Sequence, residues 1–182
     1  MGYCTANLGP LTCLVNNAAV FDKDTISDAT AEGFHHHLNT NLLAPMLLTQ
    51  SFAKQLPKEE QGNIINIADQ RVFNLQPEFT TYTLSKAGLW TLTQTTAMAL
   101  APDIRVNAIG PGPTLANSRQ TAAQFKQQQQ SVPLGYGPAP EEIAEAVLFI
   151  VRARSMTGEF ICLDGGQHLP IVQNDAKDDA YE

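Results

Sequence analysis

Four short apolar runs, separated by longer segments with helical patterns, constrain the fold of this chain more than any other feature. Continuous apolar runs of this length are typical of strands buried on both faces. Strands that alternate with helices form a parallel sheet through right-handed crossovers. We therefore predict an α/β fold with a Rossmann-like, doubly wound parallel sheet. The expected strands are Leu11 to Ala19, which would be central, Ile64 to Ile67, Arg105 to Ile109 and Glu159 to Leu163.

Capping and breaking residues set the limits of the first expected helices. Asp28 or Thr30 can cap a helix whose apolar positions continue to Phe52. Pro45 lies inside this pattern, so a kink is expected there. The next helix should run from Thr81 to Ala101, because a proline follows directly.

The last third of the chain contains a polar segment and one further helix. The segment from Thr114 to Ser131 includes the glutamine run Gln127 to Gln130, which indicates either a solvated helix face or a mobile lid. Pro140 opens the helix, and two acidic residues follow it, as the helix macrodipole favours. The apolar residues from Ile143 to Val151 should supply its buried face.

Tyr82 and Lys86 stand four residues apart at the head of the helix expected from Thr81 to Ala101. Residues at i and i+4 share one face of a helix, so the phenol and the ammonium face the same space. A nearby cation favours the phenolate, so we expect Lys86 to lower the pKa of Tyr82 and make its hydroxyl a proton donor or acceptor. The alternative is an exposed polar pair, and the neighbouring motifs decide between the two.

Five ordered motifs, including the Tyr82 and Lys86 pair, resemble the active-site half of the short-chain dehydrogenase/reductase family. The resemblance extends from about Leu11 to His168 and implies an NAD(P)H-dependent oxidoreductase that forms dimers or tetramers. The motifs are Asn16-Asn-Ala-Ala19, Gly62-Asn-Ile-Ile-Asn-Ile67, Tyr82-Thr-Leu-Ser-Lys86-Ala-Gly88, Arg105-Val-Asn-Ala-Ile-Gly-Pro-Gly-Pro-Thr114 and Asp164-Gly-Gly166.

The resemblance also implies roles for the residues at matching positions. Tyr82 would be the proton donor, and Lys86 would lower its pKa and hold the nicotinamide ribose hydroxyls. Asn41 matches the asparagine that organises a proton-relay water, with a locally bonded helix asparagine as the alternative. The implied cofactor is NADPH. Its other contacts would come from Asn17, Ala18, Pro111, Gly112 and Thr114.

Asp69 departs from the usual family pattern. Most members carry a serine shortly before the tyrosine, whereas this chain has no hydroxyl residue from Asn66 to Asn74. A carboxylate would repel the alkoxide that forms in ketone reduction, but a carboxylic acid can pass a proton to a ring nitrogen. Aspartate at this position resembles the pteridine reductase and dihydromonapterin reductase branch. We therefore expect Asp69 and Tyr82 to contact a pterin or dihydropterin substrate.

Phe21 adds to this expectation. It follows the first motif at the place where pteridine reductases stack an aromatic ring over the pterin. Such stacking is worth about 0.5–1.5 kcal/mol beyond the burial of the rings. A core phenylalanine at the end of a strand is the alternative.

The sequence contains no glycine-rich turn after a strand, although such turns hold the pyrophosphate in dinucleotide-binding folds. Against the family pattern, the first three strands are missing, so we expect an incomplete sheet with an open apolar edge and little NADPH binding. The partial domain should cover 1–170, followed by a disordered acidic tail over 171–182. A truncated inactive fragment, or a ketone or alcohol reductase, is the alternative to pterin reduction.

Composition excludes several other classes of protein. Eighteen acidic and eleven basic residues give a net charge of -7, which disfavours a nucleic-acid partner. Cys4, Cys13 and Cys162 lack paired spacing, and the consecutive His35 to His37 should form a solvated helix stretch, so no metal site is expected. No apolar run has membrane-spanning length and no leader pattern is found, so we expect a cytoplasmic protein with a small-molecule substrate.

Overall fold

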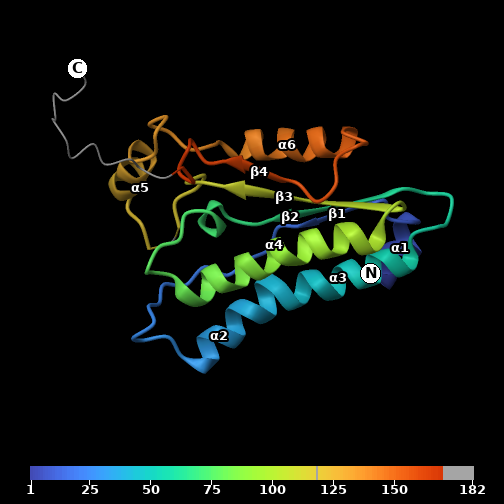
Figure 1. Cartoon of the computed structure of the whole chain (residues 1–182), viewed down its shortest axis with the longest axis horizontal. Helices are drawn as coiled ribbons and strands as arrows, with labels where there is room; N and C mark the ends of the chain where they lie inside the picture. The colour runs from blue at the N-terminus through green and yellow to red at the C-terminus, as the bar shows by residue number, and fades with distance from the viewer. Residues whose placement is uncertain (118, 170–182) are drawn as a thin grey trace, which may run out of the picture.

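The structure, a computed structural model that describes residues 1–117 and 119–169, consists of a parallel sheet with helices on both faces (Figure 1). The four strands lie in the order β1-β2-β3-β4. Their bounds are Cys13–Asn16, Gly62–Ile67, Ile104–Pro111 and Phe160–Leu163. The helices are α1 (Gly2–Leu8), α2 (Ala31–Leu38), α3 (Ala44–Gln55), α4 (Thr80–Leu100), α5 (Ala122–Gln130) and α6 (Pro140–Arg152). The expected α/β, Rossmann-like fold is therefore confirmed.

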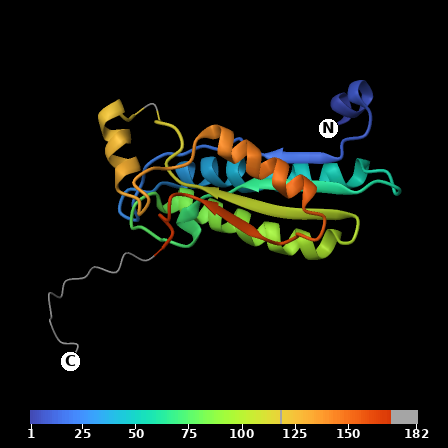
Figure 2. The ribbon, with the colours of Figure 1, turned by 90° about the horizontal axis from the view of Figure 1, so that it is seen from above.

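The alternation of side chains along β2 builds a core on each side of the sheet. Ile64 packs with Phe52 of α3 and Val106, whereas its neighbour Ile65 packs on the opposite face with Ile150 of α6. All of these side chains are fully buried. Figures 1 and 2 show α3 and α4 on one face and α6 on the other. The apolar period of two along a strand thus fixes the three layers.

The first strand is an edge strand, and the expectation that Leu11 to Ala19 would be central is wrong. β1 covers only Cys13–Asn16 and pairs with β2 alone among the described strands. Cys13 is exposed and Val15 is 40 % exposed, and within the described residues no strand lies along the other edge of β1. The apolar run predicts a strand correctly, but it does not show how many strands lie beside it.

The helix from Thr30 onward changes its hydrogen-bonding pattern in the middle. Thr30 caps α2 by accepting a hydrogen bond from the Gly33 amide, as predicted. A π-helical turn at Asn39–Leu43 then joins α2 to α3, and Pro45 occupies the first turn of α3, where its missing amide hydrogen is tolerated. Asn41 therefore lies on an irregular turn of the kind that is frequent at functional sites.

Two further segments differ from the sequence-based expectations, and a third cannot be compared with them. The exposed helix α1 carries no strong pattern and was not predicted. On α6 only Ile150 is fully buried, whereas Leu148 and Phe149 are 51 % and 55 % exposed, so its expected buried face is narrower than proposed. The expected tail at 171–182 lies outside the described residues. Among the described residues, no helix combines the length and apolar character needed to cross a bilayer.

Candidate active site

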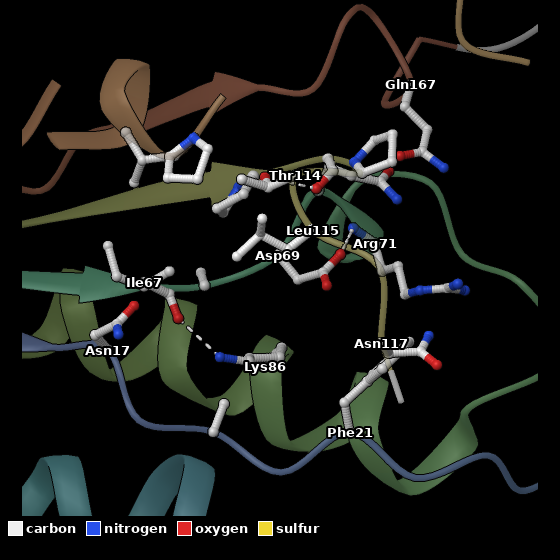
Figure 3. A pocket seen from close by; sticks show the side chains of 18 of the residues that line it. Asn17, Phe21, Ile67, Asp69, Arg71, Lys86, Thr114, Leu115, Asn117 and Gln167 are labelled. Atoms are coloured by element: carbon white, nitrogen blue, oxygen red, sulfur yellow. Dashed lines mark hydrogen bonds between the residues drawn. The ribbon is translucent and has the colours of Figure 1, made fainter. Parts of the chain in front are cut away.

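A cavity of about 570 Å³ opens at the carboxyl ends of the strands, where parallel α/β sheets usually bind ligands. Its wall includes residues that follow β1, β2 and β3, together with α4 side chains (Figure 3). Most of the residues predicted for the site lie in this wall: Asn17, Phe21, Asp69, Tyr82, Lys86, Pro111, Gly112 and Thr114. Asn41 and Ala18 are not part of it.

Asp69 and Tyr82 form a direct hydrogen bond at the centre of the cavity wall. The Tyr82 hydroxyl donates to Oδ2 of Asp69 at 2.7 Å, and the backbone amide of Arg71 donates to Oδ1 at 2.8 Å. Asp69 directly follows the end of β2 and caps the short 3-10 helix Gln70–Val72, which holds its carboxylate toward α4. The two side chains can therefore exchange a proton.

The electrostatics of this pair contradict the expectation that Tyr82 is a readily formed phenolate. Burial raises the pKa of Tyr82 well above its usual value, and the adjacent Asp69 carboxylate raises it further. Burial also raises the pKa of Asp69, although the Arg71 amide, the Tyr82 hydroxyl and the nearby cations oppose this shift. The Nζ of Lys86 lies 5.8 Å from the Tyr82 ring centroid, and its charge does not reverse the shift. Tyr82 therefore keeps its proton at neutral pH.

Lys86 is buried one turn further along α4. Its Nζ donates to the Ile67 carbonyl oxygen at 2.7 Å (Figure 3). Burial lowers its pKa to about 8, while the Asp69 carboxylate acts in the opposite direction. An ammonium has three donors, so two remain for acceptors in the cavity. The hydroxyl groups of a nicotinamide ribose are acceptors of this kind, and the contact between Lys86 and these groups remains a prediction.

The loop after β3 borders the same end of the cavity. Gly112 packs so closely that a Cβ would lie 2.6 Å from the Cα of Asp164, so a side chain would force the loop away from the turn after β4. Thr114 donates from its hydroxyl to the Gly112 carbonyl at 3.1 Å. Pro111, Gly112, Thr114 and Asn17 thus surround the space that Lys86 faces, whereas Ala18 is exposed outside it. The cofactor contacts remain predictions.

Asn41 lies outside the cavity and joins the loop after β1 to α4. Its side-chain oxygen accepts from the Val20 amide at 2.9 Å, and its amide donates to the Val20 carbonyl and to Ser85. The Ser85 hydroxyl in turn donates to the Tyr82 carbonyl. The side chain is thus engaged in local bonds, and its role in a proton relay remains a prediction.

Phe21 lies beside Tyr82 but is not a free platform. One face of its ring stacks on Phe79, with centroids 4.4 Å apart and an interplanar angle of 2°. The Tyr82 ring meets it edge-on at 4.6 Å. A ligand ring could contact only the part of the Phe21 ring that Phe79 and Tyr82 do not cover. The predicted stacking on a pterin remains a prediction.

The histidine run has mixed surroundings. His35 and His36 are exposed as expected, whereas His37 is buried and hydrogen-bonded to Thr81 and to the Asp22 amide. The prediction of a solvated helix stretch is therefore only partly correct. Among the described residues, one group could hold a metal ion: Cys162, Asp164 and His168. Asp164 is already engaged there, because it accepts from the amides of Gly166 and His168.

The site contains polar residues that sequence reasoning missed. Arg71, Asn117 and Gln167 also line the cavity and lie at the end away from Lys86 (Figure 3). The sequence could have indicated Arg71 as a residue of the site, because it stands two residues after Asp69. Asn117 and Gln167 come from distant segments, and only the fold brings them together.

A protein-family model described as "Enoyl-(Acyl carrier protein) reductase" matches residues 1–168. The chain belongs to the short-chain dehydrogenase/reductase family. Members of this family are NAD(P)-dependent oxidoreductases. The comparison confirms the resemblance that the five ordered motifs indicated.

Two solved structures are similar to this family member along almost its whole length. They are FolM alternative dihydrofolate reductase 1 from Brucella suis, in complex with NADP, and the same protein from Brucella canis, also complexed with NADP. The first is 43 % identical and covers 93 % of this chain and 68 % of its own, with a TM-score of 0.90. The second is 41 % identical and covers 98 % of this chain and 70 % of its own, with a TM-score of 0.91.

Among curated relatives, the 3-oxoacyl-[acyl-carrier-protein] reductase FabG of Thermotoga maritima is 32 % identical over 163 residues, which are 87 % of this chain and 66 % of the relative. The chain thus spans about two thirds of the length of the relatives it matches.

Proposed function

We propose that this chain takes part in the NADPH-dependent reduction of a pterin or dihydropterin ring. The observation that carries the proposal is the hydrogen bond of 2.7 Å between Tyr82 and Asp69 in the cavity wall. A carboxyl group at this position suits protonation of a ring nitrogen better than stabilisation of an alkoxide. The similarity to two alternative dihydrofolate reductases supports the same class of substrate.

Each residue of the site would have a separate role in the reaction. The chemistry supplied by NADPH, when bound, would be a hydride for the carbon of a ring C=N bond. The Asp69 and Tyr82 pair delivers one proton to the nitrogen, so that the C=N bond becomes a CH–NH unit. Because burial raises the pKa of Asp69, its carboxyl group can regain a proton more readily than an exposed aspartate. Lys86 would hold the ribose hydroxyls near this pair.

The proposal is tested by following NADPH oxidation by the 182-residue chain with 7,8-dihydropterins and, in parallel, with a 3-oxoacyl thioester. Because weak NADPH binding is expected without a glycine-rich turn, the assay is run over a range of NADPH concentrations that extends to millimolar. We expect turnover of the dihydropterin only. Tyr82→Phe and Asp69→Ser should each lower the rate about 10²–10⁴-fold, the usual contribution of a general acid. Circular dichroism of each variant controls for folding.

Two outcomes would contradict the proposal. An Asp69→Ser variant that reduces dihydropterins at the original rate would remove the argument for a heterocyclic substrate. Absence of turnover with every substrate would favour an inactive chain instead.

A further inference from the structure

Arg71 is a cation of the cavity wall whose guanidinium group has no hydrogen-bond acceptor within the described residues. The charged residues of the wall are Asp69, Arg71 and Lys86. Asp69 is bonded to Tyr82, and Lys86 to the Ile67 carbonyl. Within residues 1–117 and 119–169, no ion pair or hydrogen bond involves the guanidinium group of Arg71. The group is therefore available to a ligand.

The position of the Arg71 side chain is fixed by an aromatic contact. Its guanidinium carbon lies 4.7 Å from the centroid of the Phe79 ring, a favourable cation–π distance. Figure 3 shows the side chain running from beside Asp69 toward Asn117, away from Asn17 and Lys86. A ring held next to Asp69 would therefore extend its substituent along Arg71, at the end opposite to the space that Lys86 faces.

Resting on the pterin reduction proposed above, we propose that Arg71 binds a carboxylate on the side chain of the substrate, so that the preferred substrate is an acidic, folate-like pterin. A guanidinium can donate two parallel hydrogen bonds to a carboxylate, which gives both affinity and orientation. The net charge of -7 disfavours anions over most of the surface. A local cation with free donors is what an acidic substrate needs here.

A second role for Arg71 must be separated from this one. Its positive charge also lowers the pKa of Asp69, which lies two residues away. An arginine that acted only through Asp69 would affect every pterin to the same extent, whatever its side chain. An arginine that binds the side-chain carboxylate affects only the acidic pterins.

The test compares two oxidised pterins that need no turnover: folic acid, whose side chain carries carboxylates, and 6-hydroxymethylpterin, whose side chain is neutral. Dissociation constants are measured by calorimetry with the 182-residue chain, with Arg71→Gln and with Arg71→Lys. Arg154→Gln removes the same charge from an exposed position outside the cavity and serves as the matched control. Thermal unfolding followed by circular dichroism shows whether each variant is folded.

We expect Arg71→Gln to raise the dissociation constant of folic acid about tenfold or more, because a charge-assisted hydrogen bond is lost. The dissociation constant of 6-hydroxymethylpterin should change by less than about twofold. Arg71→Lys should retain part of the affinity, and Arg154→Gln all of it. Equal weakening of both ligands, or no effect on either, would overturn the role of Arg71 while the proposed function stands. If neither pterin binds the natural chain, the proposed function fails and this inference fails with it.

Discussion

At the scale of single residues, the site concentrates three ionisable groups that burial disfavours in their charged forms. Asp69, Tyr82 and Lys86 are largely withdrawn from water, and each has a pKa shifted toward its neutral form by burial. Such shifts cluster at functional sites because a reacting group must change its protonation state near the working pH. They also couple the stability of the fold to pH, which makes them measurable without a substrate.

Lys86 gives the first prediction of this kind. Its pKa falls from 10.5 to about 8 on folding. Between these values the unfolded chain binds a proton that the folded chain does not, so the free energy of unfolding rises with pH across this window. Relative to Lys86→Met, which cannot titrate, the natural chain should gain on the order of 3 kcal/mol from pH 8 to pH 10.5. Urea unfolding of both proteins measures the difference, and a difference independent of pH would refute the shift.

The titration of Asp69 changes the free energy of unfolding with pH in the opposite direction. Its pKa is raised on folding, so in the window above its ordinary value the folded chain binds a proton that the unfolded chain has lost. The free energy of unfolding therefore falls as pH rises through this window. Asp69→Asn removes the titration but leaves one acceptor oxygen for the two hydrogen bonds from Tyr82 and the Arg71 amide. We therefore expect the free energy of unfolding of this variant, relative to that of the natural chain, to be higher at pH 8 than at pH 4. Melting temperatures at the two pH values check this expectation, and the same variant should lose about 10²–10⁴-fold of any dihydropterin reduction.

At the scale of elements, a buried hydrogen-bond chain connects the loop after β1 with α2 and α4. The Asp22 amide donates to Nε2 of His37, so Nδ1 carries the proton and donates to the Thr81 hydroxyl at 2.8 Å. The Thr81 hydroxyl in turn donates to the Asp24 carboxylate. This series of hydrogen bonds holds the start of α4, and hence Tyr82, against the loop that carries Phe21.

The chain offers a matched pair of substitutions on α4. Thr81→Val leaves the Nδ1 hydrogen of His37 buried without an acceptor, so we expect a loss of about 1–3 kcal/mol in the free energy of unfolding. Thr83 is also buried, but its hydroxyl has no partner within the described residues. Thr83→Val should therefore be neutral or stabilising. Denaturant unfolding distinguishes the two, and equal losses for both variants would show that the hydrogen-bond chain contributes nothing specific.

The elements that could be predicted are those whose signal lies within their own sequence. The cap at Thr30 and the helix of Tyr82 and Lys86 depend on local spacing, and the structure places α4 within one residue of its expected limits. The open edge beside β1 agrees with the expectation drawn from the missing first three strands, although the apolar run alone indicated a central strand. The burial of His37 and the surroundings of the Arg71 guanidinium depend on what distant segments supply. The shift in the pKa of Tyr82 was predicted in the wrong direction because the spacing shows Lys86 but not the burial of the phenol, which is the largest cause, nor the Asp69 carboxylate, which comes from the segment after β2.

At the scale of the whole molecule, the helices on opposite sides of the sheet (Figure 1) each carry exposed apolar side chains. One belongs to α3 and α4 and includes Leu47 and Leu84, which are 48 % and 53 % exposed. The other belongs to α6 and includes Leu148 and Phe149. Apolar side chains exposed on a helix face can serve as an association surface, and two such faces, if each pairs with its own copy, permit a closed tetramer.

We therefore expect the chain to form tetramers, and a charge placed on either face to reduce them to dimers. Leu47→Glu and Phe149→Glu should each remove one interface, and the double variant should be a monomer, because burial of an unpaired charge opposes association. Ile26→Glu alters an isolated apolar side chain that is 84 % exposed and serves as the control. Sedimentation velocity measures the species. A monomeric natural chain would refute the expectation, and a double variant that still associates would point instead to the open edge of β1, whose backbone can pair with a second copy.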